Sequence, residues 1–569
     1  MRPPAALPNV VVAIRSRTHY TITERKVMIS PGNPEATQSS VDDITGLPAA
    51  RLIRHIANGD ISAVEAVEAH IDRIERVNPQ LNAMVLRRYN AAREEARFAD
   101  EQRSRGERTG ALHGLPVTIK ESLDLKGAPS TFGVTSRASS LATADEPHVA
   151  RFRNEGAIVL GKTNVAQLLF YYESDNPLHG RTNNPWRLDR TPGGSSGGEA
   201  AIIATGGSAM GLGTDIGGSI RVPAHFCGLA GLKPTEGRTP DMGRFSVPIG
   251  QRIIPSQVGV LARHVEDVAL GLEVINGGRN PDVEPPMPLA DFRDVDLRSL
   301  RVAWYADDGT FDVAPAVSRA VREAAERLRQ AGARVSPWTP PGVPHALQLF
   351  YAIFTADGGR LLRTMLGRDR RAPQIAQLLA LARLPQWLIR SVQGMLHALG
   401  QYRTASSMEA FGHDDTAHYW TLVEMVLEYR ERFRQALDQN AGGPFDLIIA
   451  PPCALPAFTH GATKDLLTAG AYACLYNVLG YPAGVVPATR VREDEQTSRA
   501  DSRDRIEKIT RQVEEASAGL PVGVQVIARP WREHVALAAM HAIEQGASAS
   551  PDFPRTPVMI AGEPAARSR

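Results

Sequence analysis

A glycine- and serine-rich stretch, residues 191–224, most strongly constrains how this chain can fold. It reads TPGGSSGGEAAIIATGGSAMGLGTDIGGSIRVPA, and the apolar segments EAAIIA and AMGLGTDI separate its glycine clusters. A flexible linker is uniformly polar, whereas these segments are apolar enough to be buried. Buried backbone must have its N–H groups satisfied, and glycine lets the chain pass close to another group. We therefore predict a buried loop beside a reactive centre rather than a tether between domains.

Short apolar runs alternate with segments of helical periodicity along the chain. A helical pattern follows Ser62, a predicted N-cap, and ends at Asn78-Pro79, and another covers Val317–Gln330. Such alternation is typical of an α/β fold, with a mixed, twisted sheet flanked by helices on both sides. The runs with strand character are Val117–Ile119, Ala157–Leu160, Leu229–Leu232 and Leu300–Trp304.

The composition is that of a globular protein, with 43% hydrophobic and 22% charged residues. The 64 Lys+Arg and 62 Asp+Glu residues give a net charge of +2, too balanced to indicate a nucleic-acid partner. Three scattered cysteines favour a reducing compartment, and we expect a cytoplasmic protein. No run reaches the roughly 18 apolar residues of a transmembrane helix.

The sequence suggests three regions. Residues 1–45 are rich in Pro, Ser and Thr and lack a sustained period, so we expect a disordered or loosely docked lead-in. Whether Met1 or Met28 is the first residue stays open. Residues 46–545 are expected to form one large domain that includes a charged helical insert, Arg492–Glu515. Residues 546–569 are expected to be a solvated tail.

Two other catalytic motifs match the sequence pattern, but the residues around them do not fit the structure that each motif requires. Residues 156–163 (GAIVLGKT) fit a phosphate-binding loop, but the residues between the glycines form a predicted strand. Residues 193–197 (GGSSG) fit a nucleophile elbow, which must follow a buried strand, whereas residues 184–192 are a polar, proline-flanked loop. His225 and His460 are available as bases, although an isolated histidine is more often structural.

Lys120 ends the apolar run in GLPVTIKESLD. Burial disfavours the charged form of a lysine, so a buried Lys120 would have a neutral amine near pH 7. A neutral lysine beside a serine hydroxyl can act as the general base that activates it. The alternative is a surface lysine whose aliphatic stem alone is buried.

Four blocks resemble those of the amidase signature family: GLPVTIKESLD, GKTNVAQ, TPGGSSGGEAA and GLGTDIGGSIRVPAHFCGLAGLKPT. They lie in a signature core of about residues 110–240, with 75 residues from Lys120 to Ser195 and 24 from Ser195 to Ser219. Later segments, such as LARLPQWLIRS and YACLYNVLGYPAGVVPATRVREDE, resemble the fatty acid amide hydrolase branch. The resemblance covers roughly residues 46–545.

The resemblance implies a serine amidohydrolase with a Ser-Ser-Lys relay. Ser219 would be the nucleophile, Ser195 the bridging serine and Lys120 the base, with a cis peptide bond before Ser195. An acyl-enzyme would form on Ser219 and be hydrolysed by water. The implied oxyanion hole consists of the N–H groups of Ile216, Gly217, Gly218 and Ser219, with Ser195 also facing the substrate.

Three further residues are expected to support this loop. Ser196 supplies a hydroxyl, and Asp215 and Arg221 form a buried ion pair that holds the backbone without taking part in the chemistry. An exposed ion pair is the alternative for the last two. We expect no metal or other cofactor.

Residues 373–400, which we call the cap region, carry an amphipathic pattern. Apolar residues recur at steps of three and four, and interspersed polar residues exclude a membrane span. They predict either a helix pair packed on the core or an amphipathic cap beside an acyl channel, in peripheral contact with a membrane. The resemblance favours the cap, for which the candidate residues are Leu384, Trp387, Leu388 and Val392.

Hydrophobic N-acyl amides are the substrates that the resemblance implies, with a homodimer as the expected assembly. A general amidase for small or aryl amides is one alternative. An amidotransferase subunit that acts on aminoacyl-tRNA with partner subunits is another. A non-catalytic binding protein on the same fold is the third.

Overall fold

The computed structural model of the protein describes residues 41–107, 110–240, 251–277, 287–382, 386–406, 416–560 and 562. Most of the predicted lead-in, residues 1–40, therefore lies outside the described residues. Its last part starts helix α1 (Val41–Gly46).

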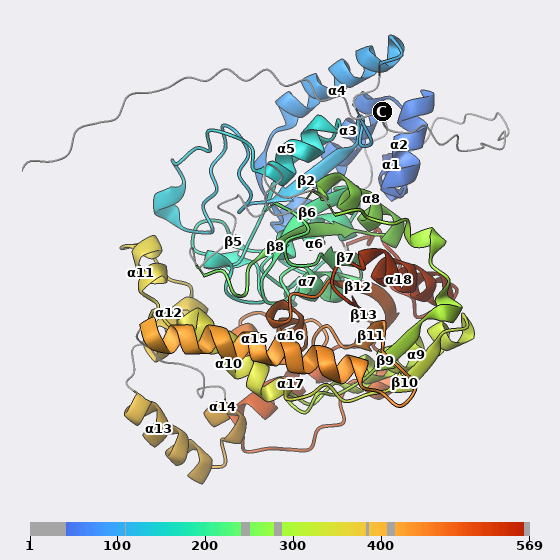
Figure 1. Cartoon of the computed structure of the whole chain (residues 1–569). Helices are drawn as coiled ribbons and strands as arrows, with labels where there is room; N and C mark the ends of the chain where they lie inside the picture. Colours follow the sequence, from blue (N-terminus) through green and yellow to red (C-terminus); the bar gives the residue numbers. More distant parts are fainter. Residues whose placement is uncertain are drawn as a thin grey trace, which may run out of the picture. The chain divides into compact units, whose positions relative to one another are not determined.

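One mixed sheet of eleven strands forms the centre of the fold (Figure 1). Its order is β1-β3-β2-β6-β8-β7-β12-β13-β11-β9-β10, and the short strands β4 and β5 pair separately. This confirms the predicted α/β class. The strands are β1 Met84–Arg87, β2 Pro116–Lys120, β3 Ile158–Thr163, β4 Asp175–Asn176, β5 Gly180–Arg181, β6 Met210–Asp215, β7 Ala230–Lys233, β8 Gln257–Ala262, β9 Arg301–Trp304, β10 Arg334–Pro337, β11 Leu447–Ala450, β12 Ala483–Arg490 and β13 Pro521–Ala528.

Helices cover both faces of this sheet. Gly484 pairs with Val526, so it faces the opposite side of the sheet from Gly523. Gly523 faces α7, whereas Gly484 faces Met540 of α18. The helices are α1, α2 Ala49–Asn58, α3 Ala63–Leu81, α4 Tyr89–Ser104, α5 Pro147–Asn154, α6 Gly197–Ala204, α7 Arg221–Cys227, α8 Val265–Ile275, α9 Pro315–Gln330, α10 Val343–Thr355, α11 Arg360–Leu366, α12 Pro373–Leu381, α13 Gln386–Ala398, α14 Tyr402–Ser406, α15 Thr416–Asp438, α16 Ala471–Val478, α17 Arg505–Glu515 and α18 Glu533–Ser548.

The first long helix begins where the sequence predicts. The Ser62 side chain accepts a hydrogen bond from Glu65 N, and the Glu65 carboxylate accepts one from Ser62 N, which forms a capping box. The helix continues through Pro79 to Leu81, beyond the predicted end, and Asn82 closes it in the left-handed conformation.

Each predicted strand is present. Strands β2, β3 and β6 are buried along their whole length and lie side by side, with β2 parallel to both neighbours. The GKT of the phosphate-loop motif lies inside β3, which confirms that these residues form no phosphate loop. Because β2 and β6 are parallel, their carboxyl ends, Lys120 and Asp215, reach the same edge of the sheet.

Part of the expected tail packs on the body, which corrects the prediction of a solvated segment. Helix α18 continues to Ser548, and Val558 N donates a hydrogen bond to Ala204 O. Ile560 is buried. In the charged insert the predicted helical character is found in α17. None of the helices in the described ranges combines the length and hydropathy needed to cross a bilayer.

Candidate active site

Lys120 and Ser195 meet in the interior. The Nζ of Lys120 lies 2.7 Å from Ser195 Oγ and 2.7 Å from Thr214 Oγ1, and it also donates to Thr214 O at 3.3 Å. Lys120 has no exposed surface, which excludes the alternative of a surface lysine with only its aliphatic stem buried. Burial lowers the pKa of Lys120 to about 7, although the negative charges of Asp215 and Glu199 act in the opposite direction. The neutral amine is therefore accessible near neutral pH.

The loop before α6 brings Ser195 to this lysine. The Gly194–Ser195 peptide bond is cis, as the resemblance implied. A Cβ at Gly194 would lie 2.4 Å from Tyr171 O and 2.5 Å from Glu173 N, so only glycine fits this close backbone approach. The stretch is buried, closely packed backbone, and the linker alternative is excluded.

Ser219 lies in the loop between β6 and α7. Its residue is 6% exposed and lines a cavity of about 90 Å³. Backbone contacts tie the two serine loops together, because Ser196 N donates to Ser219 O at 3.2 Å. The Ser196 hydroxyl donates to Thr214 O, which agrees with its predicted supporting role.

The structure corrects one of the four predicted oxyanion donors. Gly218 N already donates to Asp215 Oδ1 at 2.8 Å, so it is not free to bind a substrate oxygen. Within the described chain, the N–H groups of Ile216, Gly217 and Ser219 donate to no protein acceptor and remain candidates. Gly218 has a φ of +108°, and a Cβ there would lie 2.7 Å from the Ala473 Cβ, so its glycine shapes the turn.

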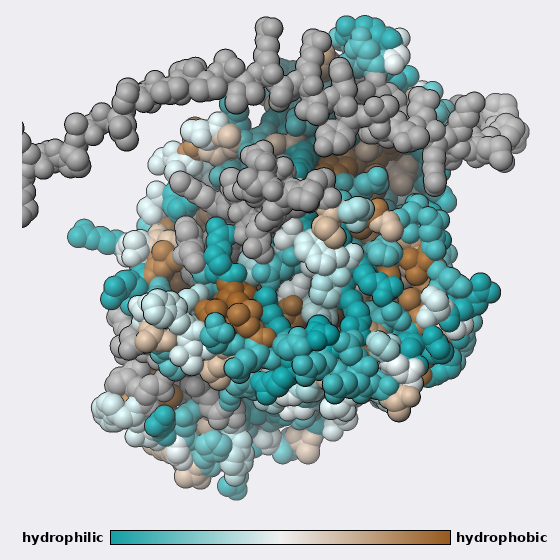
Figure 2. Space-filling model, in the orientation of Figure 1, coloured by the Kyte–Doolittle hydropathy of each residue, from teal (hydrophilic) through white to brown (hydrophobic). Residues whose placement is uncertain are grey.

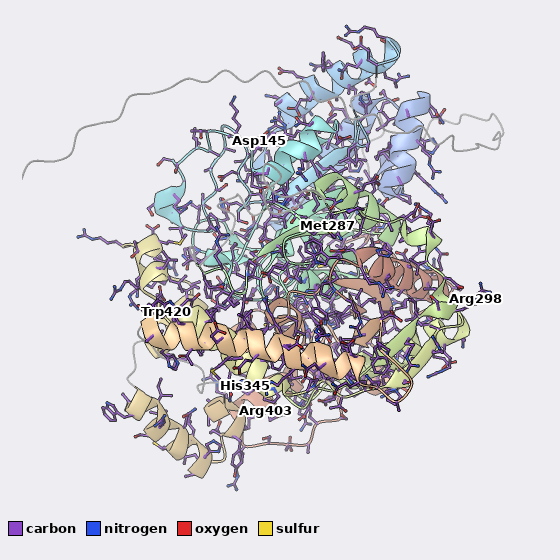
Figure 3. The ribbon with its side chains drawn as sticks, in the orientation of Figure 1. Asp145, Met287, Arg298, His345, Arg403 and Trp420 are labelled. Atoms are coloured by element: carbon purple, nitrogen blue, oxygen red, sulfur yellow. The ribbon has the colours of Figure 1, made fainter. Side chains whose placement is uncertain are left out.

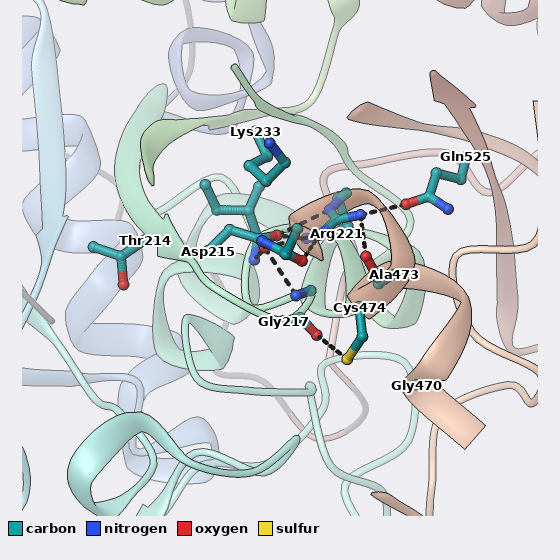
Figure 4. Close-up of polar contacts among 12 residues, drawn as sticks. Thr214, Asp215, Gly217, Arg221, Lys233, Gly470, Ala473, Cys474 and Gln525 are labelled. Atoms are coloured by element: carbon teal, nitrogen blue, oxygen red, sulfur yellow. Dashed lines mark hydrogen bonds and ion pairs between the residues drawn. The ribbon is translucent and has the colours of Figure 1, made fainter. Parts of the chain in front are cut away.

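Asp215 and Arg221 form the predicted buried pair, with both side chains fully enclosed (Figure 4). Arg221 Nε and Nη2 donate to the two carboxylate oxygens at 3.0 and 2.9 Å. Burial favours the neutral acid, but the charge and hydrogen bonds of Arg221 prevail and hold the pKa of Asp215 well below its usual range. The remaining guanidinium donors bind Ala473 O, Gln525 Oε1 and Asn477 Oδ1. The pair thus joins the serine loop to α16 and β13.

Thr214 is a contact of Lys120 that sequence reasoning missed. It lies in the same signature block, one residue before Asp215, and its position at the end of β6 could have indicated it. Tyr172 was missed as well. Its hydroxyl donates to Gly217 O at 2.6 Å and lies 3.4 Å from Cys474 Sγ, so it braces the proposed oxyanion loop.

The cavity beside Ser219 is mainly apolar. Besides Ser219, its polar lining residues include Thr355 and Gln374. Gln374 is 8% exposed, and its Oε1 has no hydrogen-bond partner in the described structure. A second cavity of about 220 Å³ shares Tyr351, Gln374, Leu378 and Leu467 with the first. Apolar residues that line the first cavity include Leu169, Phe170, Phe350, Phe354, Ile375 and Leu378.

The cap region forms two helices, α12 and α13, and contributes to the cavities through α12. Leu378 lines both cavities and Leu381 the second. Of the candidate cap residues, Trp387 is 68% exposed, whereas Leu388 and Val392 are half-buried. None of these three lines either cavity, and Leu384 lies outside the described residues.

Two further apolar side chains of the cap region and one of α15 are also exposed. Met395 and Leu399 are 56% and 62% exposed, and Trp420 of α15, labelled in Figure 3, is 67% exposed. The face drawn in Figure 2 is largely hydrophilic, with hydrophobic residues gathered in separate patches.

In the described part of the chain, neither candidate histidine has a hydrogen bond to Ser195 or Ser219. His225 Nε2 lies 3.0 Å from Leu455 O, and its Nδ1 accepts from Gly523 N at 2.9 Å. Burial lowers the pKa of His225 to about 4, so it is a neutral structural residue. His460 Nδ1 lies 2.8 Å from Glu173 Oε1. No cluster of three or more His, Cys, Asp or Glu side chains suited to a metal occurs in the described ranges.

Comparison with known proteins agrees with this geometry. The family model described as Amidase matches residues 65–537. Fatty-acid amide hydrolase 1 of Sus scrofa is 33% identical over 511 residues, which are 88% of this chain and 86% of that protein. Indoleacetamide hydrolase of Bradyrhizobium diazoefficiens is 34% identical, over 86% and 85% of the two chains. A solved fatty acid amide hydrolase superposes with a TM-score of 0.76 at 25% identity, over 90% of this chain and 86% of that one. The chain therefore belongs to the amidase signature family and is a hydrolase that cleaves amide bonds.

Proposed function

We propose that the protein hydrolyses hydrophobic N-acyl amides through a relay of Lys120, Ser195 and Ser219. The observation that carries the proposal is the 2.7 Å contact between Lys120 Nζ and Ser195 Oγ, two residues that have no exposed surface. A buried amine in contact with a hydroxyl is the arrangement that general-base activation of a serine requires.

In this proposal the proton passes from Ser219 through Ser195 to Lys120. Neutral Lys120 takes the proton of Ser195 while Ser195 takes that of Ser219, whose Oγ attacks the amide carbonyl. The N–H groups of Ile216, Gly217 and Ser219 stabilise the resulting oxyanion. The relay then runs backwards and protonates the leaving amine, and water hydrolyses the acyl-enzyme by the same route.

The apolar cavity supports an acyl group as the part of the substrate that is bound beside Ser219. Aromatic and aliphatic side chains from α10 and α12 surround it. Each methylene removed from water contributes about 0.8 kcal/mol, so affinity would grow with chain length until the cavity is full. The similar Sus scrofa protein, by its name, acts on fatty-acid amides, which supports the same class.

Peripheral membrane contact through the cap region is part of the proposal. The exposed side chains of Trp387, Met395 and Leu399 on or beside α13 support it, since apolar residues on one helix face insert into the boundary of a bilayer. A homodimer stays a prediction.

A series of N-acyl amides of one amine, from acetyl to long-chain acyl, tests the substrate class on the purified chain. We expect kcat/KM to rise with chain length, with the Ser219→Ala variant as the blank. A flat series with preference for aryl amides would favour the general amidase. Activity that requires added subunits and tRNA would favour the amidotransferase.

A further inference from the structure

Glu199 is a fully buried carboxylate in the first turn of α6, one helical turn after Ser195. The mechanism proposed above makes no use of it. A charged side chain without solvent exposure is stable only where partners compensate its lost hydration. Its partners therefore indicate what it does.

Two threonine hydroxyls bind the Glu199 carboxylate, one from β2, which carries Lys120, and one from the neighbouring strand β3. Thr118 Oγ1 donates to Glu199 Oε1, and Thr163 Oγ1 donates to Glu199 Oε2 at 2.6 Å. Thr118 lies two residues before Lys120 on β2, so both side chains point to the same face of the sheet. Thr163 of β3 is the register partner of Lys120.

The surrounding backbone leaves room for this carboxylate. A Cβ at Gly211 of β6 would lie 1.7 Å from Glu199 Oε1. Closer to the helix start, Gly198 N donates to Asn164 O, and a Cβ at Gly198 would lie 2.5 Å from Asn164 N. The start of α6, which follows Ser195 by two residues, is therefore held tightly on β2, β3 and β6.

The charges around the relay lysine are few. Asp215, Glu199 and Glu121 act on Lys120, and Asp215 is already paired with Arg221. Glu121 accepts from the backbone N–H groups of Thr131 and Phe132. Burial raises the pKa of Glu199 to about 7, against the hydrogen bonds of its two threonines and the charge of Lys120. Glu199 and Lys120 therefore change protonation in the same pH range.

We propose that Glu199 is a positioning residue for Lys120: its carboxylate, fixed by Thr118 and Thr163, holds β2 against α6 and stabilises the protonated form of the lysine during the relay. Lys120 becomes cationic when it accepts the proton of Ser195, and an ionised Glu199 lowers the free energy of that state. This inference rests on the proposed role of Lys120 as the base.

The experiment measures the pH dependence of Ser219 labelling by a fluorophosphonate, which needs no leaving-group protonation, together with kcat/KM on an amide. Glu199→Gln removes the negative charge and keeps the shape. The pKa of Lys120 should then fall, so the acid limb of both profiles should move to lower pH by about one unit. Amide turnover on the plateau should fall about tenfold, because the protonated lysine is less stable.

Thr163→Val removes one hydroxyl from the carboxylate and keeps the volume. Its matched control is Thr205→Val, at the other end of α6, where the buried Thr205 hydroxyl donates to Ala201 O and Ile202 O. For Thr163→Val we expect the acid limb to move to lower pH by less than in Glu199→Gln. For Thr205→Val we expect a pH profile identical to that of the parent protein.

A folded Glu199→Gln protein whose acid limb stays at the parent pH would overturn the inference. If that variant does not fold, a Thr163→Val profile identical to that of Thr205→Val would overturn it equally. Lys120→Ala separates this outcome from failure of the proposed function. If the acid limb of the pH profile disappears in Lys120→Ala, Lys120 is still supported as the base. If the acid limb is unchanged in that variant, the relay itself is rejected.

Discussion

Around the proposed relay, Lys120, Asp215 and Arg221 are ionisable residues without exposed surface, whereas in the cap region the large apolar side chain of Trp387 is 68% exposed. The first arrangement requires a specific partner for every polar atom, and the Arg221 guanidinium alone donates five hydrogen bonds to protein acceptors. The second needs no specific partner, because an exposed apolar surface gains from any apolar phase. The two regions therefore differ in what stabilises them: a fixed set of polar partners in the first and any apolar surroundings in the second.

The largest expected effect is that of Ser219→Ala. We expect amide hydrolysis to fall on the order of 10⁵-fold with the thermal midpoint unchanged, since the acyl-enzyme cannot form and a small hydroxyl is lost. Steady-state kinetics and thermal melting measure the two quantities. Residual activity within tenfold of the parent would mean that another group attacks the carbonyl.

Lys120→Ala should lower kcat/KM on an amide by about 10²–10⁴-fold. The loss should be smaller on an ester of the same acyl group, because an alkoxide leaves with less need for a proton than an amine does. Matched amide and ester substrates measured in parallel give the ratio. Equal losses on both would assign Lys120 to orientation of the loop alone.

Arg221→Met should destabilise the fold by about 3–5 kcal/mol, because it leaves Asp215 as an unpaired buried charge. Denaturant unfolding measures the difference. The matched control is Arg298→Met. Arg298 pairs with Asp296 on the surface, where its side chain is 79% exposed (Figure 3), and its loss should leave the unfolding free energy unchanged. Similar effects of the two variants would remove the contrast between buried and exposed polar groups.

Little effect on stability is expected at the cap region. Replacing Trp387 and Met395 with Gln should barely change the thermal midpoint, because both side chains are exposed, but should weaken binding to phospholipid vesicles. The matched variant Phe354→Ala lies in the cavity, where it is 8% exposed, and should destabilise the fold by about 3–5 kcal/mol. It should also reduce the preference for long acyl chains. Unchanged vesicle binding by the cap variant would argue against the membrane contact.

The two regions also differ in how far sequence predicted them. Lys120, Ser195 and the Asp215–Arg221 pair lie in short blocks whose residue types and glycines specify local backbone, so their proximity was foreseeable. The hydrogen bond from Gly218 N to the Asp215 carboxylate could not be foreseen. The sequence shows which backbone N–H groups lie near Asp215, but not which of them donates to its carboxylate. The cavity wall depends on packing between segments distant in sequence.

Phe350 illustrates that limit. It lines the cavity with Ser219 although 131 residues separate them in the chain. The helical pattern of the cap region predicted helices, but periodicity alone cannot say that Leu378 faces the cavity while Trp387 faces outward. In such a region, packing against segments distant in sequence determines which way each side chain points.

Fluorophosphonate labelling followed across a range of pH, with the labelled residue identified by mass spectrometry, tests the relay most directly. The account predicts one label per chain, on Ser219, with a second-order rate that rises through an apparent pKa near that of Lys120, about 7. The rate is low below that pH because the lysine is protonated and cannot accept a proton. A label on Ser195, or a rate that rises only near the ordinary lysine pKa of about 10.4, would contradict it.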